Sequence, residues 1–395
     1  MGWLDSSAAE QARMRECIRV LSQPESRDEL GIGQVRDAFA DLLFPGTSTL
    51  HTRARYLLLV PWCHREAERH GLTGDRFDRR VEKTERSLVA VLRAAGHTDG
   101  LIGRLAGPAV KVLPSTVYWS ALERYGIRLG NAVSPETSAT ADELAERSRS
   151  PWSPTLPLAP EGFPQQVEGG LELAASEAAW LRERILATTD GTLLAHLVRK
   201  RGVPGTDAAT PWHEHACHDA EDRIRDQLRH AELFSLCLHG AALLYNLLIA
   251  ERYEAAGLIE VEQPVDGYRE LLKQWEADCR ETPALKNWQQ QSMWSCVDAV
   301  NPRILANGRM RTFVDEWIAA IRATHGPPAD NARLRELVGR RERQVKKTQS
   351  RLVSERLLRT WTGASGSARL TYRWGQVCRL LDDLRTDGEA PDAAA

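Results

Sequence analysis

The chain has few lysines and no excess of positive charge. Seven of its 52 basic residues are lysines, and the formal net charge of the 395 residues is −2. The molecule as a whole is therefore not a polycation, and any affinity for nucleic acid must come from local patches. Its length exceeds that of a typical single domain, and 42% hydrophobic residues are ample for packed cores.

The sequence also lacks paired cysteines and a signal peptide. Its seven cysteines are scattered, odd in number and never in a CxxC arrangement. This usage is typical of free thiols in a reducing compartment rather than of a disulfide framework. The N-terminal stretch MGWLDSSAAEQARMRE contains no apolar signal core. We therefore expect a cytoplasmic protein.

Long apolar runs are almost absent, with one exception. Residues 234–250 contain no formal charge, and a run of this length is at the lower limit for crossing a bilayer. His239 and Asn246 lie inside the run, and charged residues flank it closely. A helix buried on all sides explains this pattern better than a membrane span. We predict the core helix of the middle region here, and no membrane partner.

Strand-like alternation is hard to find in the first third of the chain, whereas helical spacing is common. Ile32, Val35, Phe39 and Leu42 recur every three or four residues, and helices are predicted over 76–95 and 115–125. Ser7 and Glu10 have the spacing of a capping box. We predict a mainly α, multi-helix fold with two to three packed helical subdomains.

The predicted organisation has five parts. An N-terminal helical domain (1–130) precedes a proline-rich connector (131–170), a central helical domain (171–325), a basic C-terminal helical region (333–385) and a disordered tail (386–395). Five prolines at positions 151, 154, 157, 160 and 164 prevent a helix in the connector. Apolar residues among them, such as Trp152 and Phe163, predict a strap packed on a neighbouring surface. Four tryptophans of the central domain, at 275, 288, 294 and 317, are interpreted as core.

Residues 43–62 combine turn chemistry with anion-capable donors. Thr47 and its two hydroxyl-bearing neighbours are good helix caps, and a helix N-terminus near Arg53 or Arg55 could bind a phosphate. The two arginines are two residues apart, however, and therefore point to different sides of a helix. The alternative is structural: these residues cap the helix and pair with Asp37 or Asp41.

Two weaker patterns raise catalytic or metal chemistry. Asp37 and Asp41 share a helical face, and paired carboxylates bind Mg²⁺ in nucleases, but no third acidic ligand accompanies them. The run His213-Glu214-His215-Ala216-Cys217-His218 is similar to HExxH with cysteine as the second ligand, and no further Cys/His pair completes a zinc site. Phosphate-loop, GxGxxG and GxSxG motifs are absent. We assign no catalytic residue, no metal and no cofactor.

The strongest local signal is a basic segment over residues 333–359. Ten basic and three acidic residues give it a formal charge of +7. Such a helix can follow a phosphate backbone without reading bases, although a solvated or partner-facing surface is the alternative. The candidate contact residues, including the downstream extension of the patch, are Arg340, Arg341, Arg343, Lys346, Lys347, Arg351, Arg369 and Arg373.

Several blocks of the chain resemble an uncharacterised bacterial family defined as a full-length domain of unknown function. They include LGIGQVRDAFADLLFPGTSTLHTRARYLLLVPW (30–62), VYWSALERYGI (117–127), PWSPTLPLAPEGFP (151–164) and SARLTYRWGQVCRLLDDL (367–384). The resemblance spans nearly the whole chain. It implies a setting in mobile or defence islands beside helicases and nucleases, and it carries over no catalytic residues.

From these observations we expect a non-catalytic accessory subunit of a bacterial antiphage or DNA-processing assembly. It would contact DNA or a helicase or nuclease partner through the basic C-terminal region. The alternatives are a hydrolase or nuclease that uses Asp37 and Asp41, and a pure protein scaffold that presents an exposed apolar face.

Overall fold

The computed structural model describes residues 28–129, 150–200, 208–324 and 326–385. Within these ranges the regular secondary structure is helical and contains no β-strand. The β-type contact among these residues is an isolated antiparallel bridge between Arg128 and Trp152. The mainly α prediction is confirmed. The predicted capping box at Ser7 and Glu10, part of the connector (131–149) and the predicted tail (386–395) lie outside the described residues.

The first helices pack around the apolar run that follows residue 55. Helix α3 buries nearly every side chain of its first two turns, including Leu57, Leu58 and Leu59, and it contacts α4 and α5. Observed helices α4 and α5 begin and end within two residues of the predicted ones. The bounds are α2 (Gly33–Leu43), α3 (Tyr56–Glu68), α4 (Gly74–Ala94), η2 (Gly107–Ala109) and α5 (Pro114–Arg124).

The proline-rich connector is a strap on α3, as predicted for the part that the structure describes. Trp62 on α3 donates its indole N–H to the Pro157 carbonyl at 2.8 Å, and Phe163 packs edge-on against the same indole. Trp152 and Leu156 are buried. Because proline-rich backbone leaves carbonyls without helical partners, side chains of α3 satisfy them. The strap leads into α7 (Ala175–Thr188) and α8 (Leu193–Arg199).

Helix α10 (Asp222–Ala255) is the central element of the second half. Its neighbours are α2, α11 (Pro264–Arg280), α13 (Gln290–Val300), α14 (Gly308–Ala323) and α15 (Ala332–Lys346). Fourteen of the seventeen residues from 234 to 250 are buried. The predicted core helix is therefore confirmed. Helix α10 is the helix among the described residues that is long and apolar enough to cross a membrane. Of its most apolar 18-residue stretch, 83% is buried inside the protein.

The remaining elements surround α10 and return to the first half. They are η3 (Pro211–His213), α9 (His215–His218), α11 (Pro264–Arg280), α12 (Ala284–Asn287), α13 (Gln290–Val300), η4 (Pro302–Ile304), α14 (Gly308–Ala323), η5 (Pro328–Asp330), α15 (Ala332–Lys346), η6 (Lys347–Gln349), α16 (Glu355–Leu358) and α17 (Trp374–Asp383). The four central tryptophans are buried, as predicted, and each indole N–H has a partner.

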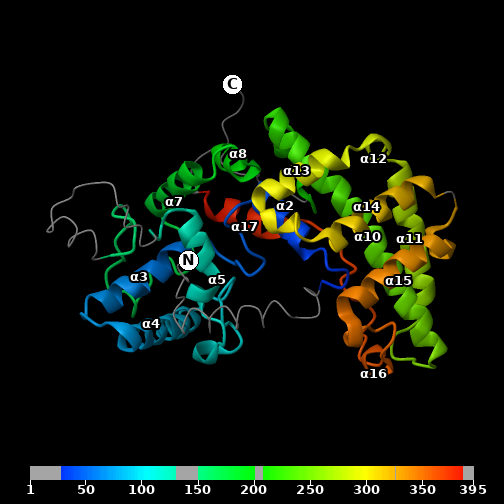
Figure 1. Cartoon of the computed structure of the whole chain (residues 1–395). Helices are drawn as coiled ribbons and strands as arrows, with labels where there is room; N and C mark the ends of the chain where they lie inside the picture. Colours follow the sequence, from blue (N-terminus) through cyan, green and yellow to red (C-terminus); the bar gives the residue numbers. More distant parts are fainter. Residues whose placement is uncertain (1–27, 130–149, 201–207, 325, 386–395) are drawn as a thin grey trace.

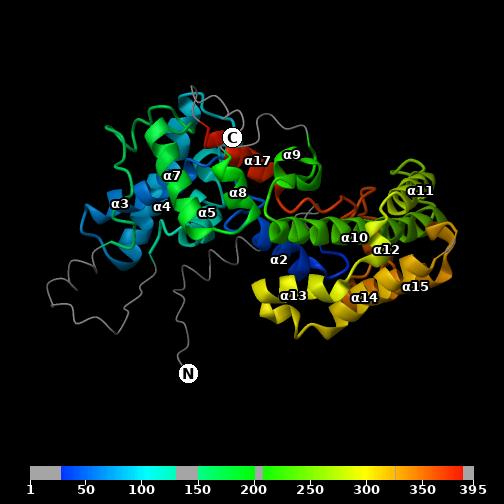
Figure 2. The ribbon, with the colours of Figure 1, turned by 90° about the horizontal axis from the view of Figure 1, so that it is seen from above.

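Figures 1 and 2 show α3, α4, α5, α7 and α8 on one side and α10 to α16 on the other, with α2 and α17 between them. The elements between them link the two sides: Arg53, just before α3, pairs with Asp383 of α17 at 2.8 Å. Arg373, just before α17, pairs with Asp41 of α2 at 2.7 Å, and α2 contacts α10 and α13. One cluster of buried apolar residues extends from Leu30 to Leu384. Contacts thus cross the boundaries proposed from the sequence, and the division into five parts stays a prediction.

Candidate nucleic-acid interface

Helix α15 carries the basic segment, and its two faces differ sharply. Asn331 caps the helix by accepting from the Leu334 N–H at 3.0 Å. Leu334, Leu337 and Val338 are buried against α10 and α14, so the opposite face is turned to solvent. Since the helix repeats every 3.6 residues, the basic residues of the segment are divided between an inner and an outer set.

The inner set holds the segment 29–31 in place. Arg341 is buried and donates to the carbonyls of Leu30 and Gly31 at 2.7 and 3.0 Å. Lys346 and Arg351 both pair with Glu29, each at 2.9 Å. Burial raises the pKa of Glu29, but the two cations outweigh it and hold the pKa below its usual value. Three of the predicted contact residues therefore stabilise the interior.

A second buried carboxylate belongs to the same cluster. Glu342 accepts from the Ser350 hydroxyl at 2.5 Å and from the Arg351 backbone N–H at 3.0 Å. Burial raises its pKa. These contacts fix the turn after α15, where Lys347 has a positive φ of 50°.

The outer set forms an exposed surface on the α14–α15 pair. Arg333, Arg340 and Arg343 follow each other at spacings of seven and three residues, so they share one face of α15, and the exposed Lys347 directly follows the helix. Arg340 pairs with Glu316 of α14 at 2.6 Å, and both side chains are nearly half exposed. For the other three, the described residues show no ion pair.

Helix α14 adds a residue to this face. The contacts Arg341–Phe313 and Arg340–Glu316 show that α14 and α15 run antiparallel. Arg309 precedes Glu316 by two turns and is exposed, so it lies toward the end of α15 that carries Lys347. We name Arg309, Arg333, Arg340, Arg343 and Lys347 the basic row.

The two arginines of residues 43–62 do not converge on a ligand. Arg53 pairs with Asp383 at 2.8 Å and Asp99 at 3.3 Å. Arg55 is buried and pairs with Glu177 at 2.9 Å, and it donates to the carbonyls of Glu168 and Gly170. The predicted divergence of the two side chains is confirmed.

The expected helix start at the hydroxyl-bearing residues is wrong. Helix α3 begins at Tyr56, and Thr47 instead donates its hydroxyl to the Phe44 carbonyl at 2.7 Å. The phenol oxygen of Tyr118 accepts the backbone N–H groups of Thr52 and Arg53. A distant tyrosine therefore occupies the donors that a phosphate would need.

Asp37 and Asp41 lie on one face of α2, as predicted, and a cation lies beside them. Arg373 is 2.7 Å from Asp41 and 4.0 Å from Asp37, and it also donates to the Thr47 carbonyl. Both carboxylates are half exposed. The arrangement is an ion-paired surface that ties α2 to the segment before α17.

The histidine-rich run is tied to its own backbone. His213 lies 2.9 Å from the Thr210 hydroxyl, and His218 lies 3.0 Å from the Trp212 carbonyl. Cys217 is buried, and burial raises the pKa of its thiol. In the part of the chain that the structure describes, no three His, Cys, Asp or Glu side chains are placed to hold a metal ion.

The chain also matches a family model from end to end, over residues 1–388. The chain belongs to the DUF6361 family, a family of unknown function. No curated protein and no solved structure matches the DUF6361 chain. The resemblance to a full-length family of unknown function is confirmed, and its link to phage-defence islands stays a prediction.

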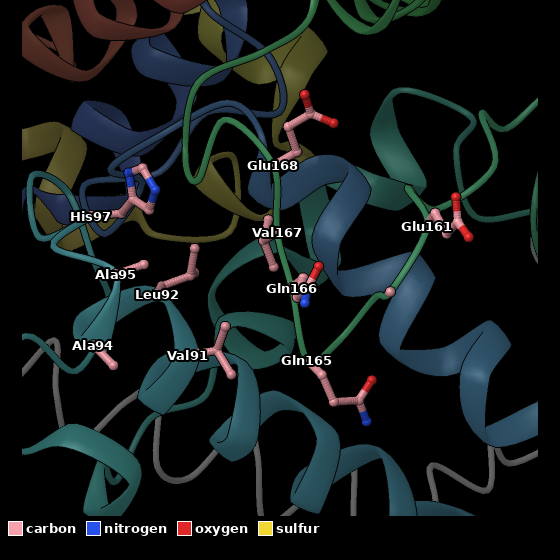
Figure 3. A pocket seen from close by; sticks show the side chains of 11 residues that line it. Val91, Leu92, Ala94, Ala95, His97, Glu161, Gln165, Gln166, Val167 and Glu168 are labelled. Carbon is pink, nitrogen blue, oxygen red and sulfur yellow. The ribbon is translucent and has the colours of Figure 1, made fainter.

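A pocket of about 950 Å³ in the DUF6361 fold lies between the end of α4 and the strap (Figure 3). Val91 and Leu92 of α4 and Val167 of the strap line its apolar part, while Glu161 and Glu168 lie on the strap side. Its carboxylates disfavour a phosphate backbone. The pocket is therefore not part of the candidate interface.

Sequence reasoning missed Arg309 in this DUF6361 chain. It lies outside the basic segment, and its neighbourhood on α14 has no cluster of charge. Only the pairing of α14 with α15 places it toward the end of α15 that precedes Lys347. A helical-wheel plot of α14 would have put Arg309 and Glu316 on one exposed face, without showing which helix lies next to it.

Proposed function

We propose that this protein is a non-catalytic, cytoplasmic accessory subunit that contacts the phosphate backbone of nucleic acid through the basic row. The observation that supports the proposal is the exposure of five basic side chains on two packed helices and the turn that follows them. Two acidic side chains, Glu316 and Glu336, share this face and reduce its formal charge to +3. The inner basic residues are excluded from the interface because their side chains are mostly buried and pair with Glu29 or with backbone carbonyls.

The length of the row fits contact with several phosphates. Arg333 and Lys347 lie about four helical turns apart, which is about 21 Å along a helix. One strand of duplex DNA places a phosphate at about every 3.4 Å of its axis. Contacts of this kind position a protein without reading sequence. We therefore propose binding to DNA without strong base preference, within an antiphage or DNA-processing assembly.

The scaffold alternative has less support in the described residues. It requires a contiguous apolar surface, but the large exposed apolar side chains there come from separate segments, such as Leu105, Leu158, Ile259 and Val353. Single exposed apolar residues are normal on soluble proteins. We keep a helicase or nuclease partner in the same assembly as part of the proposal, but not as a ligand of an apolar surface.

Binding to a labelled duplex at 50 and 200 mM salt tests the proposal. Three to five phosphate contacts predict an affinity about 40- to 500-fold weaker at the higher salt, because each contact releases a condensed counterion. Fluorescence anisotropy measures both values with the purified full chain. Absence of binding at 50 mM salt, or equal affinity at both concentrations, would refute phosphate-driven binding.

A further inference from the structure

Arg369 lies apart from the basic row, in the segment between α16 and α17 that runs along α10. Hydrogen bonds fix the residues that directly follow the arginine. The Ser235 hydroxyl donates to the Leu370 carbonyl at 2.7 Å, and the Tyr372 hydroxyl donates to the Ala231 carbonyl at 2.7 Å. The position of residue 369 against the middle of α10 is therefore well defined.

The side chain of Arg369 stacks on a tryptophan. Its guanidinium carbon lies 5.3 Å from the centre of the Trp212 ring, and Trp212 is only 4% exposed. Within the described residues Arg369 has no ion pair and no hydrogen bond, and its Nε atom is buried. A half-buried arginine of this kind has guanidinium donors available for a ligand.

Trp212 also has a hydrogen-bond donor without an acceptor. Its indole Nε1 is buried and has no hydrogen-bond partner in the described structure. The indole Nε1–H and the guanidinium N–H groups can donate but not accept, so they cannot satisfy each other. Buried donors without partners are rare and costly. An acceptor-only group with several oxygen atoms would satisfy both side chains.

The neighbouring titratable groups do not form an ion pair with Arg369. Glu232 and His239 lie two turns apart on the same face of α10. Burial raises the pKa of Glu232, although the nearby charge of Arg369 opposes this shift. Burial lowers the pKa of His239, and the charge of Arg369 lowers it further. Both shifts favour the uncharged forms. The Asp278 carboxylate of α11 opposes the shift of His239.

We infer that Arg369 and Trp212 form a binding site for a small oxyanion, the phosphate or carboxylate group of a ligand. The guanidinium supplies the charge and a planar set of donors, and the indole N–H adds a directed hydrogen bond. This site is independent of the basic row. Arg369 belongs to the segment before α17 and lies beside Glu232 and His239 of α10, whereas the basic row lies on α14, on α15 and directly after α15.

Indole N–H resonances report on this site directly. The chain has 12 tryptophans, so labelling with ¹⁵N-tryptophan should give 12 indole N–H signals. The signal that disappears in the W212F variant belongs to Trp212. Titration with inorganic phosphate at constant ionic strength should move that signal saturably. The matched control is Trp361, which is also buried with an unpartnered Nε1 but packs against Tyr253 and Tyr268 rather than an arginine. Its signal should not move.

Variants and a second anion complete the test. In R369Q the Trp212 signal should respond to phosphate with an affinity at least tenfold weaker, since a charge-assisted contact is lost. If R369Q does not fold, R369K keeps the charge and should still weaken binding through loss of the planar donors. Acetate in place of phosphate decides between a carboxylate and a phosphate ligand. The row variant R340Q/R343Q/K347Q should titrate like the wild type.

Two results would overturn the inference. One is a Trp212 signal that phosphate and acetate leave unmoved, or that chloride moves equally. The other is an unchanged phosphate response in both Arg369 variants while the remaining indole signals show a native fold. Neither result bears on DNA binding by the basic row, whose own test is the salt dependence of duplex affinity.

Discussion

At the scale of single residues, charge is often an interior feature of this protein. Arg55 is only 3% exposed, and its partners, Glu177 and two strap carbonyls, come from a distant part of the sequence. A buried pair of this kind contributes little net stability relative to apolar replacements, but removal of one partner leaves the other charge unpaired. A basic residue can therefore be assigned to an interface only after it is known whether its side chain is exposed or already paired in the interior.

Replacement of Arg55 alone should be costly. R55L leaves the Glu177 carboxylate buried without its cation, and we expect a loss of about 3–5 kcal/mol in the free energy of unfolding. The double variant R55L/E177L should lose less than the sum of the two single variants. Urea unfolding of all three proteins measures both values, and additive losses would contradict the account of a coupled pair.

A histidine makes the stability depend on pH. His51 stacks on Tyr118 with ring centres 4.2 Å apart, and burial, aided by nearby Arg373, lowers its pKa to about 4. The unfolded chain binds this proton near pH 6.5, so its contribution to stability is complete above pH 6.5 and is lost between pH 6.5 and 4. The loss amounts to about 3 kcal/mol at most.

The comparison that isolates His51 is the variant H51Q. Unfolding free energies at pH 7 and pH 4.5 should differ by less in H51Q than in the wild type, by about 2 kcal/mol. Buried carboxylates such as Glu29 contribute equally to both proteins and cancel. Identical pH dependence of the two proteins would show that the pKa of His51 is the same in the folded and unfolded states, and would contradict the account.

At the scale of elements, the packing of α10 against α11 depends on the absence of a side chain. A Cβ atom at Gly240 would lie 2.2 Å from two ring carbons of Trp275, whose indole N–H donates to the Leu236 carbonyl. The indole can therefore not move aside without the loss of a buried hydrogen bond. Gly240 is a packing requirement of the two helices, although glycine is a poor helix former.

The variant G240A should be destabilised by overpacking, by about 1–3 kcal/mol. Gly267 on α11 is the matched control, because a Cβ there would meet no atom within 4 Å. G267A should be stabilised by about 0.5–1 kcal/mol, the ordinary preference for alanine in a helix. Thermal unfolding compares the two, and an equal response of both variants would contradict the packing argument.

The sequence predicts elements better than it predicts partners. Helices α4 and α5 lie within two residues of their predicted bounds because their apolar spacing is set by local geometry. The predicted start of α3 is wrong because Tyr118, which belongs to α5, occupies the backbone donors of Thr52 and Arg53. Likewise, no local pattern shows that Glu29, near the other end of the chain, neutralises Lys346 and Arg351. The inner and outer basic sets are separable only in three dimensions.

At the scale of the whole molecule, the chain closes on itself. Helix α17 returns to the first half, where Asp383 accepts from the Ala54 N–H at 2.6 Å and from Arg53, and Arg182 donates to the Leu384 carbonyl at 2.5 Å. The core cluster is continuous across both halves. The proposed DNA contact is thus a surface feature on one side of a connected molecule, and charge changes there should leave the fold intact.

The salt dependence of duplex binding in two matched triple variants tests the central claim most directly. R340Q/R343Q/K347Q removes three charges from the basic row, and R69Q/R79Q/K83Q removes three exposed charges from the end of α3 and from α4. We predict that the row variant makes the slope of log affinity against log salt shallower, with its magnitude reduced by about 2.7. The control variant should keep the wild-type slope. Both should unfold at the wild-type temperature. Equal loss of affinity in the two variants, or wild-type binding by the row variant, would contradict the account.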